Sequence, residues 1–360
     1  MVTLNVPCFL SRNTRSIGDL NLDGNTYSSA GVNLGNLEAL KDRIKAFSTL
    51  THGPEVLDAG GSFAGVYNLS GYEKPVLISS TDGVGTKLRI AAQLGHFESV
   101  GQDLVTLNVN DILTKGAKPL FFLDYISFSH LDNQRMEMLL RGIVWGCKEV
   151  GCSLIGGETA QMPGMYSAED FDLAGFVVGA AERGNVIDGS SVIPGDVLIG
   201  FPSSGLHTNG FSLVRKVFQT EENPSILYQH FEELGHTLGE ELLVRHRSYY
   251  PLLEPIMSLC KGLSHVTGGG LPGKMPPMLP PTVAVEFQLG SWVVPPIFDL
   301  IRTTGGVSED EMYTVFNMGL GMICACEEES VATILDTIPD AQVVGVVVPR
   351  DSEPQVKLVK

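Results

Sequence analysis

The sequence predicts an α/β or α+β protein built from two halves of similar size. Its 360 residues favour two domains over one. Apolar residues make up 43% and charged residues only 18%, a composition that suits packed cores and argues against disorder. Strand-like and helix-like segments alternate on both sides of a turn-rich stretch at 182–196. We therefore expect one domain over residues 1–184 and another over 185–360.

In the first half, apolar runs rich in β-branched and aromatic residues predict strands, at 76–80, 119–128 and 173–181. Residues 132–150 carry apolar side chains at helical spacing, and Asp132 is placed to cap that helix. Residues 1 to about 25 have weak periodicity and predict a loose arm.

The second half repeats the mixed pattern. Strands are expected at 197–201, 318–326 and 341–349, with one helix near 328–337 and another at 209–219. Thr208 or Asn209 is the expected N-cap of the helix at 209–219.

Charge and targeting signals narrow the classes of function. The formal net charge of −17 would repel DNA or RNA over most of the surface, whereas a locally positive pocket can still hold a small anion. No signal peptide is visible, and the longest apolar run, near 174–181, is too short to span a bilayer. The six cysteines form no C-x-x-C pair, so we expect buried free thiols in a cytoplasmic protein.

One segment resembles two familiar nucleotide-binding motifs, but we do not assign either motif to it. Residues 268–273 fit G-x-G-x-x-G, yet the prolines from Pro272 onward are expected to prevent the helix that a dinucleotide fingerprint must open. The same glycines followed by Lys274 nearly fit a P-loop, but Met275 replaces the Ser or Thr that binds magnesium.

Three carboxylates stand at the ends or inside apolar elements. Asp82 follows an apolar strand and precedes Gly83, Gly85, Thr86 and Lys87, a pattern that suits Mg²⁺ with phosphate. Asp111, beside Asn110, lies in an apolar helical run, and Glu158 follows a strand and a Gly-Gly turn. Together the three could bind one or two magnesium ions, although each alone is also explained by a turn, a cap or a solvated side chain.

Three loops are candidate anion cradles. The glycine-rich segment 59–67 could wrap phosphates with backbone amides, or be a flexible connection. His207 precedes the predicted helix at 209–219, whose N-terminal amides would attract an anion. The turn 265–270 is another possible backbone cradle.

Taken together, these segments resemble one family. DGVGTK, NVND, GAKPLFFLDY, GCSLIGGETAQMPGMY, SSGLHTNGFSLVRK, HVTGGG and FNMGLGM occur in the order and at roughly the spacing of the aminoimidazole ribonucleotide synthetases. The match runs from about Tyr27 to Val348, and the two longest motifs, GGETAQMPGMY and SSGLHTNG, are specific.

The resemblance implies a fold, a reaction and a set of site residues. The N-terminal α/β domain would build a β-barrel across a homodimer, with a C-terminal α/β domain beside it and the active site in the cleft between them. The reaction would close an imidazole ring on formylglycinamidine ribonucleotide, using ATP and Mg²⁺. Site residues implied by the resemblance are, for catalysis, His207, Asp82 and Lys87; for metal, Asp82, Asp111 and Glu158; for phosphate, Gly61, Ser62, Phe63, Gly65, Gly83, Gly85, Thr86 and Asn110; and for substrate, Lys45, Asn209, Thr267, Gly268 and Gly269. His207 is the expected proton-transfer residue.

The chain departs from the family pattern at three places. The loop that usually reads GGFGG in the family is Gly61-Ser62-Phe63-Ala64-Gly65 in this chain. After TGGG the family usually has Asn-x-Pro-Arg, whereas this chain has Lys274 to Pro277. Asn33 stands where the family usually has Asp. Two alternatives therefore stay open: a small-molecule kinase or phosphate-activating synthetase of the same superfamily, and a non-catalytic paralogue that binds nucleotide.

Overall fold

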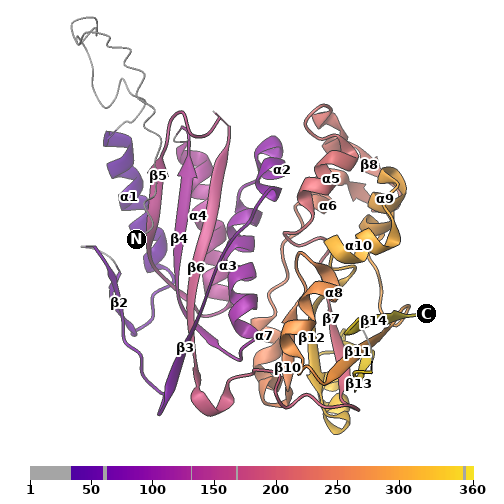
Figure 1. Ribbon diagram of the computed structural model, residues 1–360. Helices are drawn as coiled ribbons and strands as arrows, with labels where there is room; N and C mark the ends of the chain where they lie inside the picture. The colour runs from indigo at the N-terminus through magenta and orange to yellow at the C-terminus, as the bar shows by residue number, and fades with distance from the viewer. Residues whose placement is uncertain (1–33, 60–62, 131, 168, 352–353) are drawn as a thin grey trace, which may run out of the picture.

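A computed structural model describes residues 34–360, apart from 60–62, 131, 168 and 352–353. The expected N-terminal arm, Gly61 and Ser62 lie outside the described residues. Figure 1 shows two layered halves side by side, each built around its own β-sheet. None of the described helices is long and apolar enough to cross a membrane.

The first half is a four-stranded sheet with helices on one face. Its strand order is β3-β6-β4-β5, where β3 spans Pro75–Gly83, β6 Phe171–Glu182, β4 Lys118–Phe128 and β5 Ser153–Gln161. Strand β6 pairs antiparallel with β3 and β4, and β4 pairs parallel with β5. Strands β3, β4 and β5 therefore run in one direction, and their carboxyl ends lie at the same end of the sheet.

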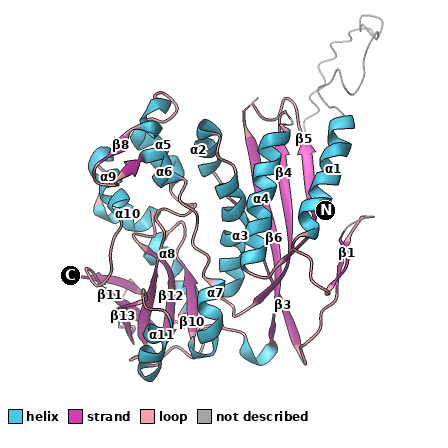
Figure 2. Ribbon diagram, turned by 180° about the vertical axis from the view of Figure 1, so that it is seen from behind, coloured by secondary structure: helices cyan, strands magenta, loops and turns pink. Residues whose placement is uncertain are grey.

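Helices α3 (Glu98–Leu113) and α4 (Asn133–Glu149) cover one face of this sheet, as the two opposite views show (Figures 1 and 2). The two helices approach closely because glycine replaces a side chain at their contact. A Cβ on Gly142 would lie 2.1 Å from the Glu98 carbonyl oxygen. Helices α1 (Leu34–Thr49) and α2 (Lys87–Leu94) flank this layer, and the β1–β2 hairpin (Val56–Ala59 and Gly65–Tyr67) lies beyond β5.

The other face of the sheet is not covered by any helix of the described residues. Along β3, Leu77, Ser79 and Thr81 are exposed, while the residues between them are half-buried. Phe176 and Tyr125 are each 37% exposed on the neighbouring strands, and Leu77 is 61% exposed. An apolar sheet face left open in one chain is a typical surface for association.

The second half is a six-stranded sheet of order β10-β12-β7-β13-β11-β14. These strands span Gly262–His265 (β10), Leu320–Cys326 (β12), Val197–Pro202 (β7), Gln342–Pro349 (β13), Val283–Gln288 (β11) and Val356–Val359 (β14). All pairs are antiparallel except β11 with β14. A two-stranded ribbon and seven described helices complete this half: β8 (His230–Phe231), β9 (His236–Thr237), α5 (Phe211–Phe218), α6 (Leu238–Leu242), α7 (Tyr250–Leu253), α8 (Gly270–Lys274), α9 (Pro296–Gly305), α10 (Glu309–Val315) and α11 (Val331–Thr337).

The two halves share a hydrophobic core at their junction. Successive side chains of a strand point to opposite faces, so Leu198 packs in the core under α5 and α9, whereas Ile199 and Phe201 pack in the core that continues into α3 and α4. Tyr249, which is fully buried, belongs to this shared core. This continuity fixes the edge of one half against the edge of the other, where the candidate site residues gather.

Most predicted elements are confirmed, with two local corrections. The strands at 119–128 and 173–181 and the helix from 133 are present, and the Asp132 side chain accepts hydrogen bonds from the amides of Gln134 and Arg135. The expected cap of α5 is wrong, because the helix begins after Gly210, which adopts a left-handed φ of 77° without a side-chain cap. The prediction that prolines exclude a helix near 268–273 is also wrong.

The short helix α8 contains Pro272, which lies in its first turn, where a missing N–H leaves no intrahelical bond unmade. Its five residues still fall short of the long helix that a dinucleotide fingerprint opens. The described cysteines, Cys147, Cys152, Cys260, Cys324 and Cys326, are free and buried as expected.

Candidate active site at the junction of the two halves

The turn between β3 and α2 presents polar groups at the junction. Asp82 is exposed, and its Oδ1 accepts a hydrogen bond from the Gly83 amide at 2.7 Å. Gly85 adopts a left-handed φ of 72°, which glycine takes without strain and which turns the chain into α2. Thr86 Oγ1 lies 3.1 Å from Ser212 Oγ at the start of α5. The turn from the first half therefore touches the helix N-terminus of the second.

The predicted substrate segments also meet there. The Asn209 side chain lies against Gly268, because a Cβ on that glycine would lie 3.3 Å from Asn209 Oδ1. Gly268 is exposed, Thr267 is half-buried, and Gly269 adopts a φ of 103° that suits only glycine. Glycine-rich turns and small polar side chains of this kind suit a phosphorylated ligand.

Lys87 does not take the position expected of a phosphate ligand. Its side chain is fully buried, and Nζ lies 2.7 Å from Asp103 Oδ2. The same ammonium donates to the carbonyl oxygens of Val244 at 2.8 Å and His207 at 3.2 Å. With these acceptors already in place, Lys87 ties α2 to α3 and to two loops of the second half, so we do not assign it a direct phosphate contact.

His207 is likewise buried, at 2% exposure, in a left-handed turn with a φ of 61°. Burial, helped by the nearby charges of Lys87 and Arg247, holds the pKa of the His207 imidazole well below its usual range. Its Nε2 accepts a hydrogen bond from the Ser204 amide at 3.2 Å. The role of His207 as the proton-transfer residue stays a prediction, and burial shields the ring from solvent in this arrangement.

Asn110 and Asp111 project from α3 into the junction. The Asn110 side chain donates to the Arg247 carbonyl oxygen and accepts from the Tyr249 amide, so it holds the 247–249 segment rather than an open pocket. Asp111 accepts a hydrogen bond from Ser80 at 3.0 Å and pairs with His265 Nδ1 at 2.8 Å. Although burial raises its pKa, these contacts outweigh burial and keep the pKa of Asp111 below its usual value.

The remaining predicted residues lie on the far side of the first sheet. Glu158 is exposed on β5, and Phe63 is fully exposed in the loop before β2. Gly65 packs against β5, since a Cβ there would lie 2.9 Å from the Ile155 carbonyl oxygen. Lys45 is exposed on α1, which packs against α4 and β5. Strands β3 and β5 are three strand spacings apart, or about 14 Å.

The structure therefore separates the three expected metal carboxylates. Asp82 and Asp111 are neighbours, because Ser80, two residues before Asp82 on β3, donates to Asp111. Glu158 stands at the opposite edge of the sheet. In the described part of one chain the three carboxylates do not form one cluster, and their joint role in binding one or two magnesium ions stays a prediction.

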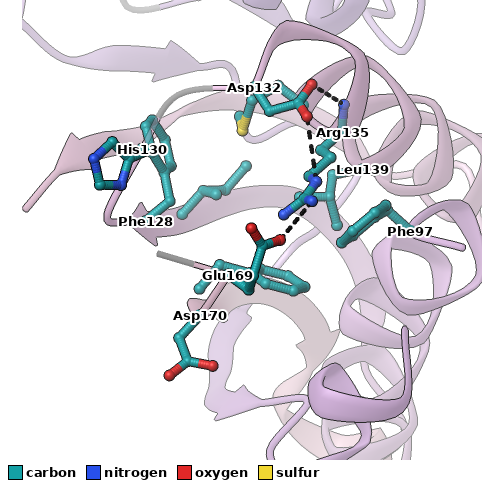
Figure 3. A pocket seen from close by; sticks show the side chains of 11 residues that line it. Phe97, Phe128, His130, Asp132, Arg135, Leu139, Glu169 and Asp170 are labelled. Atoms are coloured by element: carbon teal, nitrogen blue, oxygen red, sulfur yellow. Dashed lines mark hydrogen bonds and ion pairs between the residues drawn. The ribbon is translucent and has the colours of Figure 1, made fainter. Parts of the chain in front are cut away.

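A small pocket at the upper end of the first half does not compete with this site (Figure 3). Its volume of about 30 Å³ has room for about two water molecules. Arg135 lies inside it, paired with Asp132 at 3.2 Å and with Glu169 at 2.6 Å. These carboxylates satisfy the one arginine that lines the pocket, so the pocket offers no cation to an anionic ligand.

Several junction residues were missed by the sequence analysis. His246 and His265 lie beside His207, Asp103 pairs with Lys87, and Ser212 touches Thr86. His265 is the first residue of the HVTGGG motif, and Ser212 lies within the SSGLHTNGFSL segment. Both motifs were singled out in the sequence, so these two residues could have been chosen as candidates. Nothing in the local pattern around His246 or Asp103 distinguishes them from ordinary loop and helix residues.

Comparisons with known proteins place the chain in a family. Residues 61–181 match the N-terminal domain of AIR synthase related proteins, and residues 194–357 match the C-terminal domain of the same family. The chain belongs to the AIR synthase family. The resemblance inferred from the motifs is thereby confirmed, as is the two-domain α/β class.

Individual family members are similar over nearly their whole length. The chain is 45% identical to the phosphoribosylformylglycinamidine cyclo-ligase of Geobacillus kaustophilus, over 87% of this chain and 92% of that protein. It is 48% identical to the protein of the same name from Caldicellulosiruptor bescii, over 85% of this chain and 91% of that protein.

Solved structures share the fold at low sequence identity. Thiamine-monophosphate kinase from Stenotrophomonas maltophilia has a TM-score of 0.61 at 16% identity, over 89% of this chain and 95% of that chain. The hydrogenase maturation protein HypE, solved in complex with ATP, also has a TM-score of 0.61 at 16% identity, over 86% of this chain and 87% of that chain. These likenesses concern the fold alone.

Proposed function

We propose that the protein catalyses the ATP-dependent cyclisation of formylglycinamidine ribonucleotide to 5-aminoimidazole ribonucleotide, with release of ADP and phosphate, in purine biosynthesis. The observation that carries this proposal is the extent of the match to the cyclo-ligases, 45% identity over 87% of the chain. Two contacts support a phosphate-binding role for this region: Thr86 lies against Ser212, and Asn209, three residues before Ser212, lies against Gly268.

The chemistry explains why ATP is needed. Ring closure must expel the oxygen of a formyl amide, which is a poor leaving group. That oxygen attacks the γ-phosphorus and ADP departs, so the oxygen becomes part of a phosphate ester. The neighbouring nitrogen then attacks the activated carbon, phosphate leaves, and loss of a proton completes the imidazole. Positioning and charge neutralisation provide most of the catalysis in phosphoryl transfer.

Mg²⁺ fits the donor set of Asp82 and Glu158. Both carboxylates are exposed, and Asp82 Oδ2 and Glu158 have no hydrogen-bond partner among the described residues. Hard, anionic oxygens of this kind are what Mg²⁺ prefers. When bound, the ion would neutralise charge on the ATP phosphates. Asp111 has both oxygens engaged by Ser80 and His265, so we place it behind the magnesium site rather than in it.

The site is proposed to be shared between two copies of the chain. In one copy, Asp82 and Thr86 stand at the β3 edge, while Glu158 and the 61–65 loop stand at the β5 edge. If the open faces of two sheets turn toward each other about an axis parallel to the strands, the β3 edge of one meets the β5 edge of the other in parallel. The eight strands would then close into a barrel, and each barrel seam would join the two half-sites.

The exposed apolar side chains of the open face support this association. Leu77, Tyr125 and Phe176 would be removed from water inside the barrel, and each Å² of apolar surface so buried contributes about 25 cal/mol. Closure would also cover both free sheet edges, which otherwise invite unwanted strand pairing.

The direct test is a reaction assay. The purified protein is incubated with ATP, Mg²⁺ and formylglycinamidine ribonucleotide, and the products are separated and identified. We expect the imidazole ribonucleotide together with equimolar ADP and phosphate. Phosphorylated but uncyclised substrate would instead support a kinase, and no turnover with intact ATP binding would support a non-catalytic paralogue. The division into domains at residues 184 and 185 also stays a proposal, which limited proteolysis can test.

A further inference from the structure

Three histidines meet at the junction behind the proposed active site. His207 comes from the turn after β7, His246 from the loop between α6 and α7, and His265 from the end of β10. Their exposures are 2%, 4% and 5%. The rings of His207 and His246 stack with centroids 3.9 Å apart, and the Nε2 atoms of His246 and His265 are 3.1 Å apart. One ring nitrogen from each lies within 4.8 Å of the others.

The hydrogen bonds of this cluster suit one arrangement of the protons. When His265 is neutral and its Nδ1 donates to the Asp111 carboxylate at 2.8 Å, His265 Nε2 is left with a lone pair that faces His246. A single proton on His246 Nε2 would bridge the two rings. The other nitrogen of His246, Nδ1, has only the Thr208 hydroxyl at 3.4 Å, a long contact that either atom could donate.

His207 adds a polar atom without a partner. Its Nε2 accepts from the Ser204 amide, so the proton of the neutral ring is on Nδ1, which is buried and has no hydrogen-bond partner among the described residues. A buried polar atom left unsatisfied in this way costs about 1–3 kcal/mol. Burial also keeps the pKa of the His207 and His246 rings well below the usual range, so both rings are neutral. Neutral imidazoles are the form in which histidine binds metal.

We propose that His207, His246 and His265 bind one divalent transition-metal ion of the Zn²⁺ class, with Asp111 orienting His265. Zn–N bonds of about 2.1 Å in a tetrahedral site place ligand nitrogens about 3.4 Å apart, close to the 3.1 Å between His246 and His265. The ion takes the place of the proton between these two rings. That proton moves from Nε2 to Nδ1 of His246, which then donates a hydrogen bond to the Thr208 hydroxyl. The third ligand, His207, has to give up the hydrogen bond from the Ser204 amide to bring a free lone pair to the ion, and its ring has to turn out of the stack on His246. The ligand nitrogens, which lie within 4.8 Å of one another, then close to about 3.4 Å.

The surroundings of the cluster suit such an ion. A carboxylate behind a ligating histidine is the usual outer partner at zinc sites, and Asp111 holds that place behind His265. The nearby cations are already paired, Lys87 with Asp103 and Arg247 with Asp340 at 2.8 Å. Of the three histidines, His246 lines a cleft of about 430 Å³, so the cluster lies next to a solvent-filled space.

This site differs from the proposed magnesium site in both ligands and purpose. Three imidazoles select a borderline metal, whereas Mg²⁺ prefers oxygen. Because β10 belongs to the second half and Asp111 to helix α3 of the first, the ion would fasten the two halves together behind the active site.

The experiment uses the full-length protein, freed of metal by a chelator and dialysed. Zn²⁺ is titrated by calorimetry, and Co²⁺ is titrated by its visible absorption, which reports a tetrahedral nitrogen environment. We expect one equivalent per chain, unaffected by excess Mg²⁺. His246→Gln and His265→Gln should each weaken binding by about 100-fold or more, and Asp111→Asn by about 10–100-fold. The matched control is His130→Ala, which removes an exposed histidine outside the cluster and should bind as wild type does.

Wild-type protein that takes up no equivalent of Zn²⁺ or Co²⁺ would overturn the proposal, whatever the variants do. Binding that is equally strong in His246→Gln, His265→Gln and His130→Ala would overturn it too, and would leave only a hydrogen-bonded pair of rings. Circular dichroism before metal addition separates loss of a ligand from loss of the fold. A rise in Tm with Zn²⁺ that is present in wild type and His130→Ala but absent in the cluster variants gives a second readout.

Discussion

At the scale of single residues, the junction between the two halves contains a buried ion pair. Lys87 and Asp103 are both fully buried, and burial raises the pKa of the Asp103 carboxyl even though the ammonium of Lys87 opposes that effect. A buried pair of this kind contributes little by comparison with well-packed apolar groups, but removing one partner strands the other charge. Lys87 therefore matters to the fold whether or not it ever meets a phosphate.

Replacing this lysine tests the structural role. Lys87→Met should lower the free energy of unfolding by about 3–5 kcal/mol, because Asp103 and two loop carbonyls lose their cation. The matched control Lys115→Met removes an exposed lysine and should change stability by less than about 0.5 kcal/mol. Urea denaturation of the three proteins measures the differences. Equal stabilities of the two variants would contradict the burial of Lys87.

Much of this residue-level detail could not be predicted from the sequence. Asp132 was identifiable as a cap because its signal is local, four to five residues of pattern. The partner of Lys87 is 16 positions away on another helix, and His246 meets His265 across a loop and a strand. Such pairings depend on tertiary packing, and a local sequence pattern carries no information about contacts between distant residues.

At the scale of elements, strand order decides which candidate residues can act together. Strands β3, β4 and β6 were predictable from their apolar runs, whereas β5 continues through Gly156, Gly157 and Glu158, where the sequence analysis expected a turn. The order of the strands in the sheet was not predictable. That order places Asp82 and Glu158 at opposite edges and thereby separates carboxylates that the motifs had grouped. It also places Asp124 of β4 in the interior, where burial, with a smaller contribution from Glu158, raises the pKa of its carboxyl to about 7.

This buried carboxyl should make stability depend on pH. Between about pH 4, near the pKa of an unfolded Asp, and about pH 7, the folded protein keeps a proton that the unfolded chain has lost. The contribution of Asp124 to the free energy of unfolding should therefore fall as pH rises through this window, by up to about 1.4 kcal/mol per pH unit. The Asp124→Asn variant has no titratable carboxyl at this position, so this pH dependence should be absent from it. Unfolding free energies of both proteins at several pH values should differ by an amount that changes with pH, and a constant difference would refute the assignment.

At the scale of the whole molecule, the open sheet face and the split site point to the same arrangement. The family and the two-domain class followed from motifs that run along the chain, and both are confirmed. The barrel and the homodimer stay predictions, because the described first half of the chain holds a four-stranded sheet that does not close on itself. The proposed shared site needs a second copy to bring Glu158 beside Asp82.

Dimerisation through this face can be tested with one charge. Phe176→Glu places a carboxylate in the middle of the proposed barrel, where an unpaired charge is costly, and should shift the protein to a monomer. Tyr228→Glu is the matched control, because Tyr228 is 65% exposed in the second half of the chain. Sedimentation velocity at micromolar concentration reads out both. Wild-type protein that sediments as a monomer, or a Phe176→Glu variant that stays dimeric, would exclude this interface.

The shared site itself is tested most directly by mixing two inactive variants. Asp82→Asn and Glu158→Gln damage opposite half-sites, and each should lower turnover by on the order of 10²-fold or more. After the two proteins are mixed in equal amounts and allowed to exchange subunits, about half of the dimers should be mixed. Each mixed dimer then holds one intact site and one doubly damaged site, so activity should recover to about a quarter of the wild-type value. If the mixture is no more active than either variant alone, although subunit exchange is demonstrated, the two carboxylates belong to the same copy and the shared site is contradicted.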